Sequence, residues 1–366
     1  MTATQIKVLI MAGGTGGHIF PALSVADVLK SRGIATEWLG ATRGMEEELL
    51  RSTGIPLHCI AMKGVRGKGL WRLLLAPFMA MAATIQAMRV IRAVSPGCVL
   101  GFGGYVTGPG GVAARLLGKN LLIHEQNSVA GISNRILTIM ASRVMEAFPG
   151  TFTPGPKVIH TGNPVRAEIV MAGRIRKYNP EKSQPLRILV LGGSQGATAI
   201  NELIPELLAN WRSEPRPQVW HQTGRKHLNA CLAGYRSTGV TLDQKCRVEG
   251  FIADMAQAYG WADLVVCRSG ASTVSELAVA GLPSVLIPYP HHADQQQVTN
   301  ARWLSDAGAA HLVLQSDLSL TGLTSILRAL DFDRQKLIDM ASTARTLAVD
   351  NAGELIVQQC LEVCND

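Results

Sequence analysis

The chain has 366 residues, of which 47% are hydrophobic, and its 35 basic and 27 acidic residues give a formal net charge of +8. This length accommodates two domains of ordinary size, and the basic balance favours acidic partners such as phosphorylated substrates, anionic lipids or nucleic acid. Seven cysteines without a C-x-x-C pair argue against a disulfide framework and a zinc ribbon. No signal peptide precedes the first strand-like run, and the mostly apolar stretch 73–88 is short for a bilayer span. We therefore expect a soluble, cytoplasmic protein with at most a peripheral membrane contact.

The first strand-like run leads directly into a glycine-rich loop. Residues 6–12 are mostly apolar and rich in β-branched side chains, which predicts a buried parallel strand. The loop 13–18 follows, and residues 20–29 then show helical spacing with Pro21 expected in the first turn. Glycines let a backbone approach a phosphate closely, and a helix N-terminus attracts anions, so this loop is a candidate ligand site.

The same order of strand, loop and helix returns just past the middle of the chain. Residues 186–191 predict a strand, 192–196 a glycine-rich loop, and 199–208 a helix whose first turns Pro205 is expected to limit. The aligned loop positions are Gly13, Gly14, Thr15 and Gly17 with Gly192, Gly193, Ser194 and Gly196. Two such loops, each opening a domain-sized segment, predict an α/β fold of two Rossmann-like domains facing a cleft.

Further apolar runs end in glycine-rich or polar residues, which is where open α/β sheets bind their ligands. They are residues 98–100, 121–124, 264–267 and 284–288. The polar, proline-flanked stretch 179–185 predicts a linker, while a functional hinge is expected earlier, near 162–164.

Neither glycine loop matches a P-loop or a G-x-G-x-x-G motif, and the second strand-like run ends in Trp38-Leu39-Gly40 instead of an acidic residue. An ordinary NAD dehydrogenase is therefore disfavoured, although tight strand–helix turns without a ligand stay as an alternative. His18 ends the first loop and is a candidate general base, against the alternative that it has no special role.

A third polar turn reads Ser269-Gly270-Ala271-Ser272-Thr273-Val274-Ser275-Glu276. Its hydroxyls and amides suit a phosphate, and Glu276 suits ribose hydroxyls. The alternative is helix capping by Ser272 or Thr273 with an acidic first turn, and both interpretations can hold together.

Two further polar segments bear on metal binding. The run His291-His292-Ala293-Asp294-Gln295-Gln296-Gln297 matches no strong zinc pattern and better suits a loop that offers amides to sugar hydroxyls. Asp331-Phe332-Asp333 forms a D-x-D, which we interpret as a surface turn or helix start and not as a site for a metal-bound diphosphate. We expect no metal ligand and no cofactor.

Residues 63–79 combine basic side chains with apolar bulk, and Arg89 and Arg92 follow. This composition suits docking on an anionic membrane surface, with a core helix behind a basic loop as the alternative. Nucleic-acid binding is disfavoured because the basic cluster lacks interleaved aromatic side chains that could stack bases.

In this order the motifs resemble the MurG family of peptidoglycan glycosyltransferases, in glycosyltransferase family 28, over nearly the whole chain. The marks are Gly13-Gly14-Thr15-Gly16-Gly17-His18, Gly103-Gly104-Tyr105 with Gly108-Pro109-Gly110-Gly111, His124-Glu125-Gln126-Asn127, Gly162-Asn163-Pro164-Val165-Arg166, Gly192-Gly193-Ser194-Gln195-Gly196, and Cys267-Arg268-Ser269-Gly270-Ala271 through Glu276.

The resemblance implies a GT-B fold: 1–165 is an acceptor- and membrane-facing domain, 166–346 binds UDP-GlcNAc, and a helix over about 347–366 packs back on the first domain. It also implies a metal-independent, inverting transfer of N-acetylglucosamine from UDP-GlcNAc to the C4 hydroxyl of the muramyl sugar of lipid I, giving lipid II. The enzyme would lie peripherally on the cytoplasmic face of the bacterial inner membrane. Its candidate partners there are the anionic lipid surface around 63–79 and other cell-wall synthesis proteins, without nucleic acid.

The resemblance also implies roles for individual residues. The UDP would be held by Ser194, Arg166 and the turn from Ala271 to Glu276, with backbone groups of Ile252 at the uracil. Gln296 and Gln297 would read the donor sugar, and the glutamine-rich sequence leaves the choice between them open. The acceptor side would be lined by Thr15, Gly16, Gly17, His18 and Asn127, with His18 as the base and Glu125 as its alternative.

Three other interpretations are compatible with the sequence. A GT-B transferase acting on another lipid, such as diacylglycerol, would share the motifs. A non-hydrolysing UDP-GlcNAc 2-epimerase would share the two-domain plan and turn over the donor without an acceptor. A basic membrane-surface binding module would explain the cationic segment but would not need two phosphate loops and a third polar turn.

Overall fold

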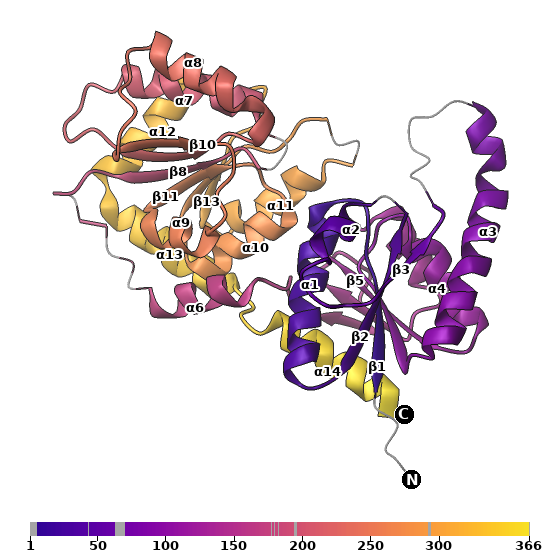
Figure 1. Ribbon diagram of the computed structural model, residues 1–366. Helices are drawn as coiled ribbons and strands as arrows, with labels where there is room; N and C mark the ends of the chain where they lie inside the picture. Colours follow the sequence, from indigo (N-terminus) through magenta and orange to yellow (C-terminus); the bar gives the residue numbers. More distant parts are fainter. Residues whose placement is uncertain are drawn as a thin grey trace. The chain divides into compact units, whose positions relative to one another are not determined.

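The computed structural model describes residues 6–42, 44–62, 70–176, 178, 180–181, 183–193, 196–291 and 294–365 (Figure 1). The chain divides into two compact units: Met1–Val165 together with Asn351–Asp366, and Arg166–Asp350. The division lies beside Gly162-Asn163-Pro164, and the polar stretch 179–185 falls inside the second unit.

Over its described residues, the first unit contains a seven-stranded parallel sheet of order β3-β2-β1-β4-β5-β6-β7. The strands are β1 (Lys7–Met11), β2 (Ala35–Ala41), β3 (Leu57–Ile60), β4 (Cys98–Gly101), β5 (Asn120–Glu125), β6 (Arg143–Glu146) and β7 (Val158–His160). The helices are α1 (Gly16–Ser31), α2 (Met45–Leu49), α3 (Leu70–Val94), α4 (Thr107–Leu116), α5 (Ile132–Leu137) and α14 (Ala352–Asn365).

Alternate residues of β1 belong to two different cores, because successive side chains of a strand point to opposite faces. Val8 and Ile10 pack with α1 and α14 on one face, whereas Leu9 and Met11 pack with α3, α4 and α5 on the other. The last helix of the chain thus completes the first unit (Figure 1), where the side-chain amide of Asn120 also donates to the carbonyl of Val363.

The second unit repeats this plan with a described six-stranded parallel sheet of order β10-β9-β8-β11-β12-β13. The strands are β8 (Arg187–Leu191), β9 (Gln218–Gln222), β10 (Cys246–Glu249), β11 (Leu264–Cys267), β12 (Ser284–Leu286) and β13 (Ala310–Leu312). The helices are α6 (Ala167–Ile175), α7 (Thr198–Ala209), η1 (Arg225–His227), α8 (Leu228–Ser237), α9 (Met255–Trp261), α10 (Ala271–Ala280), α11 (Gln296–Ser305), α12 (Leu320–Phe332) and α13 (Arg334–Leu347).

Both sheets have the strand order of a doubly wound Rossmann fold, so the predicted α/β class is confirmed. The order reverses between β1 and β4 in the first unit and between β8 and β11 in the second. Ligands of such sheets bind beyond the carboxyl ends of the strands at this reversal. Both glycine loops begin there, because they follow β1 and β8 directly.

Two prolines sit deeper in their helices than the sequence suggested. Helix α1 begins at Gly16, so Pro21 falls in its second turn, and α7 continues past Pro205 to Ala209. A proline inside a helix leaves the carbonyl four residues earlier without its usual donor. For Pro205 that carbonyl belongs to Asn201, and the thiol of Cys231 donates to it at 3.6 Å.

The seven cysteines are free thiols. Among the helices that the structure describes, none is long and apolar enough to cross a membrane.

Candidate active site

At the first reversal the backbones of two loops are in direct contact. Met11 and Gly101, the last residues of β1 and β4, are register partners, and the loops that follow begin side by side. Gly104 has a φ of +82°, and a Cβ built on it would lie 2.2 Å from the carbonyl oxygen of Gly13. Only glycine fits there, so the Gly103-Gly104 pair of the motif is explained by packing against the first glycine loop.

The first glycine loop ends in the first turn of α1. Thr15 is the N-cap residue in an extended conformation, and the backbone N–H of His18 donates to its carbonyl at 3.1 Å. Gly16 and Gly17 are the first two helical residues, so their N–H groups have no partner within the helix. The structure thus places Thr15, Gly16, Gly17 and His18 together at one helix N-terminus, an arrangement suited to an anionic or polar ligand.

The ring of His18 is held by a chain of hydrogen bonds that runs into the unit. Its Nδ1 lies 2.7 Å from Oε1 of Gln126, and Nε2 of Gln126 lies 3.0 Å from Nδ1 of His124. Nε2 of His124 lies 2.9 Å from the carbonyl oxygen of Gly162. Burial lowers the pKa of His124 to about 4, a shift that its hydrogen bond to Gly162 opposes. The sequence motif contained Gln126 but assigned no role to it.

Glu125 is the last residue of β5, and both of its carboxylate oxygens accept hydrogen bonds. Its Oε1 accepts from the backbone and side-chain N–H groups of Asn127 at 3.0 and 3.2 Å. Its Oε2 accepts from the backbone of Gly131 at 3.0 Å and from Asn134 at 2.9 Å. Glu125 is 1% exposed, so these contacts are suited to holding the loop that follows β5 and to positioning Asn127. They favour His18 over Glu125 as the base that accepts a proton from a substrate.

At the second reversal, the second glycine loop follows β8 and the polar turn follows the neighbouring strand β11. Gly193 and Gly196 have positive φ values of 73° and 81°, while Ser194 lies outside the described residues. Helix α10 begins at Ala271 with Gly270 as its N-cap residue, and no side chain caps it. The hydroxyl of Ser272, in the first turn, is buried without a hydrogen-bond partner. The helix predicted from the sequence is therefore present, but it is not capped by Ser272 or Thr273, which leaves its N-terminal N–H groups for a ligand.

Glu276, in the second turn of α10, is the charged group of this turn. Its Oε2 accepts from the hydroxyl of Tyr259 at 2.8 Å, and its Oε1 lies 3.4 Å from the guanidinium of Arg166. Burial raises the pKa of Glu276, and the two partners oppose that shift. Arg166 and Glu276 are 110 residues apart in sequence, and the structure brings them together as the sequence assignment required. No sequence pattern, by contrast, indicated that Tyr259 contacts this site.

Of the remaining assigned residues in the second unit, Ile252 lies in the loop between β10 and α9, and Gln296 and Gln297 begin α11. The backbone N–H of Ile252 donates to Oε1 of Gln222 at 2.9 Å, so its carbonyl is the group left for a base. Oε1 of Gln297 accepts from the backbone of Tyr289 at 2.9 Å, whereas Nε2 of Gln296 donates to the exposed Asp294 at 3.0 Å. Gln297 thus supports the loop backbone, while Gln296 contacts a surface side chain.

The described residues of the two candidate metal segments form no ligand cluster, and His292 lies outside them. Over the described part of the chain, no three His, Cys, Asp or Glu side chains are grouped to hold an ion. Asp333 is the N-cap residue of α13, where it accepts from the backbone of Lys336, and Asp331 pairs with Arg334 at 2.5 Å. The expectation that the D-x-D marks a helix start is confirmed.

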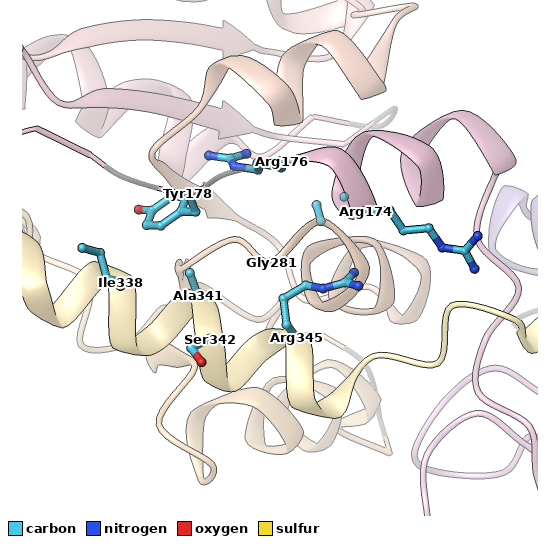
Figure 2. A pocket seen from close by; sticks show the side chains of 10 residues that line it. Arg174, Arg176, Tyr178, Gly281, Ile338, Ala341, Ser342 and Arg345 are labelled. Carbon is cyan, nitrogen blue, oxygen red and sulfur yellow. The ribbon is translucent and has the colours of Figure 1, made fainter.

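A cavity of about 290 Å³ lies elsewhere in the second unit (Figure 2). Arg176 and Arg345 line it, but their guanidinium groups donate to backbone carbonyls near the ends of helices. Both arginines therefore have a structural role that requires no ligand. Arg176 reaches the carbonyl of Tyr259 in the last turn of α9 and that of Ala262 directly after it, and Arg345 reaches the carbonyl of Val279 in α10. We place a candidate ligand site at the strand-order reversal of each unit and none in this cavity.

The chain is similar to known proteins over nearly its whole length. Residues 8–146 match the model of the glycosyltransferase family 28 N-terminal domain, and residues 187–358 match that of the C-terminal domain. A crystal structure of MurG from Acinetobacter baumannii is 40% identical, with a TM-score of 0.82, over 98% of this chain and 99% of that one. A Pseudomonas entomophila protein named UDP-N-acetylglucosamine–N-acetylmuramyl-(pentapeptide) pyrophosphoryl-undecaprenol N-acetylglucosamine transferase is 50% identical over 100% of both chains.

The chain belongs to the MurG family. It is a glycosyltransferase of family 28 with the GT-B fold. Likeness to more distant structures concerns the fold alone: a UDP-GlcNAc 2-epimerase from Neisseria meningitidis is 15% identical, with a TM-score of 0.66, over 98% of this chain and 100% of that one. The MurG relatives therefore decide between the transferase and epimerase interpretations, which share this fold.

Proposed function

We propose that this chain transfers N-acetylglucosamine from UDP-GlcNAc to the C4 hydroxyl of the N-acetylmuramyl sugar of lipid I, giving lipid II for peptidoglycan synthesis. The observation that carries the proposal is the presence of the family's motifs, in order and over the full length of the chain, with the two glycine loops at the two strand-order reversals. His18 lies at one reversal; Glu276 belongs to α10, the helix that opens at the other, and Arg166 pairs with it.

The two units take different parts in this proposal. The second unit binds the donor: N–H groups at the start of α10, the hydroxyl of Ser272 and the cation of Arg166 suit a diphosphate. Glu276 accepts from ribose hydroxyls, and the carbonyl of Ile252 meets the uracil. Ser194 stays assigned to the diphosphate by resemblance. The first unit binds the acceptor through Thr15, Gly16, Gly17 and Asn127.

The proposed reaction is a single inverting displacement. The acceptor oxygen attacks the anomeric carbon from the face opposite the diphosphate, the new C1–O bond forms, and the bond from C1 to the UDP oxygen breaks. His18 takes the hydroxyl proton as general base. Arg166 and the N-terminus of α10 stabilise the negative charge that develops on the leaving diphosphate, so we propose that no divalent ion is required.

We further propose that the first unit docks on the anionic cytoplasmic face of the inner membrane. Helix α3 exposes Phe78 by 65%, Met81 by 58% and Ile85 by 46%, although exposed apolar side chains in a soluble protein need no partner when single. Three on one helix, next to the basic segment 63–69, suit a lipid surface. Residues 63–69 themselves lie outside the described part of the chain.

The membrane proposal predicts that a combined Phe78→Glu and Met81→Glu variant sediments less with vesicles rich in phosphatidylglycerol than the unaltered chain does. Ile175→Glu is the matched control, because Ile175 is 76% exposed but belongs to the second unit. Equal sedimentation of the double variant and the control would contradict the docking surface.

The transferase proposal is tested by incubating the chain with radiolabelled UDP-GlcNAc and a lipid I analogue. We expect a labelled disaccharide lipid and release of UDP, both lost in His18→Ala. Diacylglycerol in place of the lipid I analogue should yield no product, and UDP-GlcNAc alone should yield neither UDP nor the 2-epimer. Turnover of the donor without an acceptor, or transfer to diacylglycerol, would refute the proposal.

A further inference from the structure

The side-chain amide of Gln126 has one chemically consistent orientation. Its Nε2 contacts the carbonyl oxygen of His124 at 2.9 Å and Nδ1 of the same residue at 3.0 Å. A carbonyl oxygen only accepts, so the amide nitrogen must face this side and donate. The amide oxygen therefore faces His18, and Gln126 is 1% exposed, so water does not compete for these contacts.

The position of the proton on His124 agrees with this orientation of the Gln126 amide. Its Nε2 lies 2.9 Å from the carbonyl of Gly162, which requires an N–H at Nε2. The ring is fully buried and its pKa is lowered to about 4, so it is neutral near pH 7 and carries that single proton. Its Nδ1 is then an acceptor, in agreement with the donated amide N–H of Gln126.

These constraints propagate to His18. The oxygen of Gln126 cannot donate, so the nitrogen 2.7 Å away, Nδ1 of His18, must carry the hydrogen. We infer that Gln126, oriented by His124 and Gly162, is a positioning residue that holds His18 as the Nδ1–H tautomer with an unprotonated Nε2 available to accept the acceptor's proton.

This inference rests on the proposed function for its catalytic consequence but not for the tautomer itself. When the hydroxyl proton moves to Nε2, the ring becomes an imidazolium whose Nδ1–H still donates to Gln126. The partner is a neutral amide and not a carboxylate, so it fixes orientation and tautomer without adding a charge. The role corresponds to that of the orienting group in nucleophile–histidine triads, in which a wrong tautomer costs activity although the geometry is kept.

The first experiment uses the unaltered chain without substrate. Long-range ¹H–¹⁵N spectra of histidine-labelled protein at pH 8, above the usual histidine pKa of about 6.5, distinguish the two neutral tautomers. The chain has nine histidines, so the signal of His18 is identified by its loss in His18→Ala. We expect the Nδ1–H form; a His18 signal of the Nε2–H form would overturn the inference.

The second experiment tests the role of Gln126 with Gln126→Met, which keeps the side-chain length but removes both polar atoms. We expect the His18 signal to shift toward the Nε2–H form, and kcat for transfer to fall about 10-fold or more. UDP affinity and the thermal unfolding midpoint should stay close to those of the control Gln358→Met, an exposed glutamine on α14. A fall in kcat without the tautomer shift, or a shift without a fall in kcat, would overturn the positioning role.

The two proposals fail separately. If no lipid II analogue forms but His18 is the Nδ1–H tautomer, the proposed function fails and the tautomer assignment stands. If transfer proceeds normally while His18 carries its proton on Nε2, the function stands and the positioning role of Gln126 fails.

Discussion

Replacing Gly104 by alanine tests whether contact between the two loops of the first unit determines turnover. The new Cβ would lie 2.2 Å from the carbonyl oxygen of Gly13 and 3.0 Å from its carbonyl carbon. Ordinary contacts begin near 3.4 Å, so the loops must separate by about 1 Å. Because the loop from Gly13 leads into His18, we expect kcat/KM to fall about 100-fold, the usual cost of a displacement of about 1 Å at a reacting centre. This corresponds to about 2.7 kcal/mol of transition-state stabilisation.

The matched control for that variant is Gly118→Ala. Gly118 also has a positive φ, +66°, but a Cβ there meets nothing within 4 Å. It precedes β5, at the sheet edge opposite the carboxyl ends of the strands. We expect the control to lose about 1–2 kcal/mol of unfolding free energy from backbone strain alone and to keep its kcat/KM. Urea unfolding and the transfer assay measure the two quantities. If the two variants have the same kcat/KM, loop contact does not determine turnover and the reasoning is refuted.

Four other predictions concern the chemistry. His18→Ala should lower kcat by about 100-fold or more while UDP-GlcNAc affinity stays near that of the unaltered chain, and near-normal turnover would exclude His18 as the base. Because burial raises the pKa of Glu276 above its usual 4.5, its carboxylate takes up a proton on acidification before an ordinary glutamate does. UDP affinity, measured by calorimetry, should therefore weaken as the pH falls toward that raised pKa, and Glu276→Gln should bind weakly at every pH; an unchanged pH profile in that variant would contradict the ribose contact. Gln296→Ala should relax discrimination between UDP-GlcNAc and UDP-glucose in competition assays, whereas Gln297→Ala should lower the unfolding midpoint because its side chain holds the backbone of Tyr289; the reverse pattern would exchange the two roles. Transfer should persist in excess EDTA, and a loss restored by adding a divalent ion would show that the diphosphate needs a metal.

The elements that the sequence predicted well are those defined by local signals. Apolar runs such as 186–191 predict a buried strand. The glycines that follow permit positive φ values, as Gly193 and Gly196 show. The helix limits were less predictable, because Pro21 and Pro205 mark an N-terminus by preference only, and tertiary contacts can tolerate them inside a helix. The hydrogen bond from the thiol of Cys231 to the carbonyl of Asn201, four residues before Pro205, is such a contact.

The sequence by itself determined the duplicated strand–loop–helix plan, the family and the residue types at the two glycine loops. Each of these depends on short runs of neighbouring residues, which can be recognised without the fold. Only the tertiary structure decided which side chains act together. Gln126 reaches His18 across 108 residues, and His124 reaches Gly162 across 38, so no local pattern could connect them. The parallel sheet makes these contacts possible because it brings the carboxyl ends of distant strands to one edge. There, the hydrogen bonds of buried, neutral groups leave one arrangement of protons, and with it one nitrogen of His18 on which a base can act.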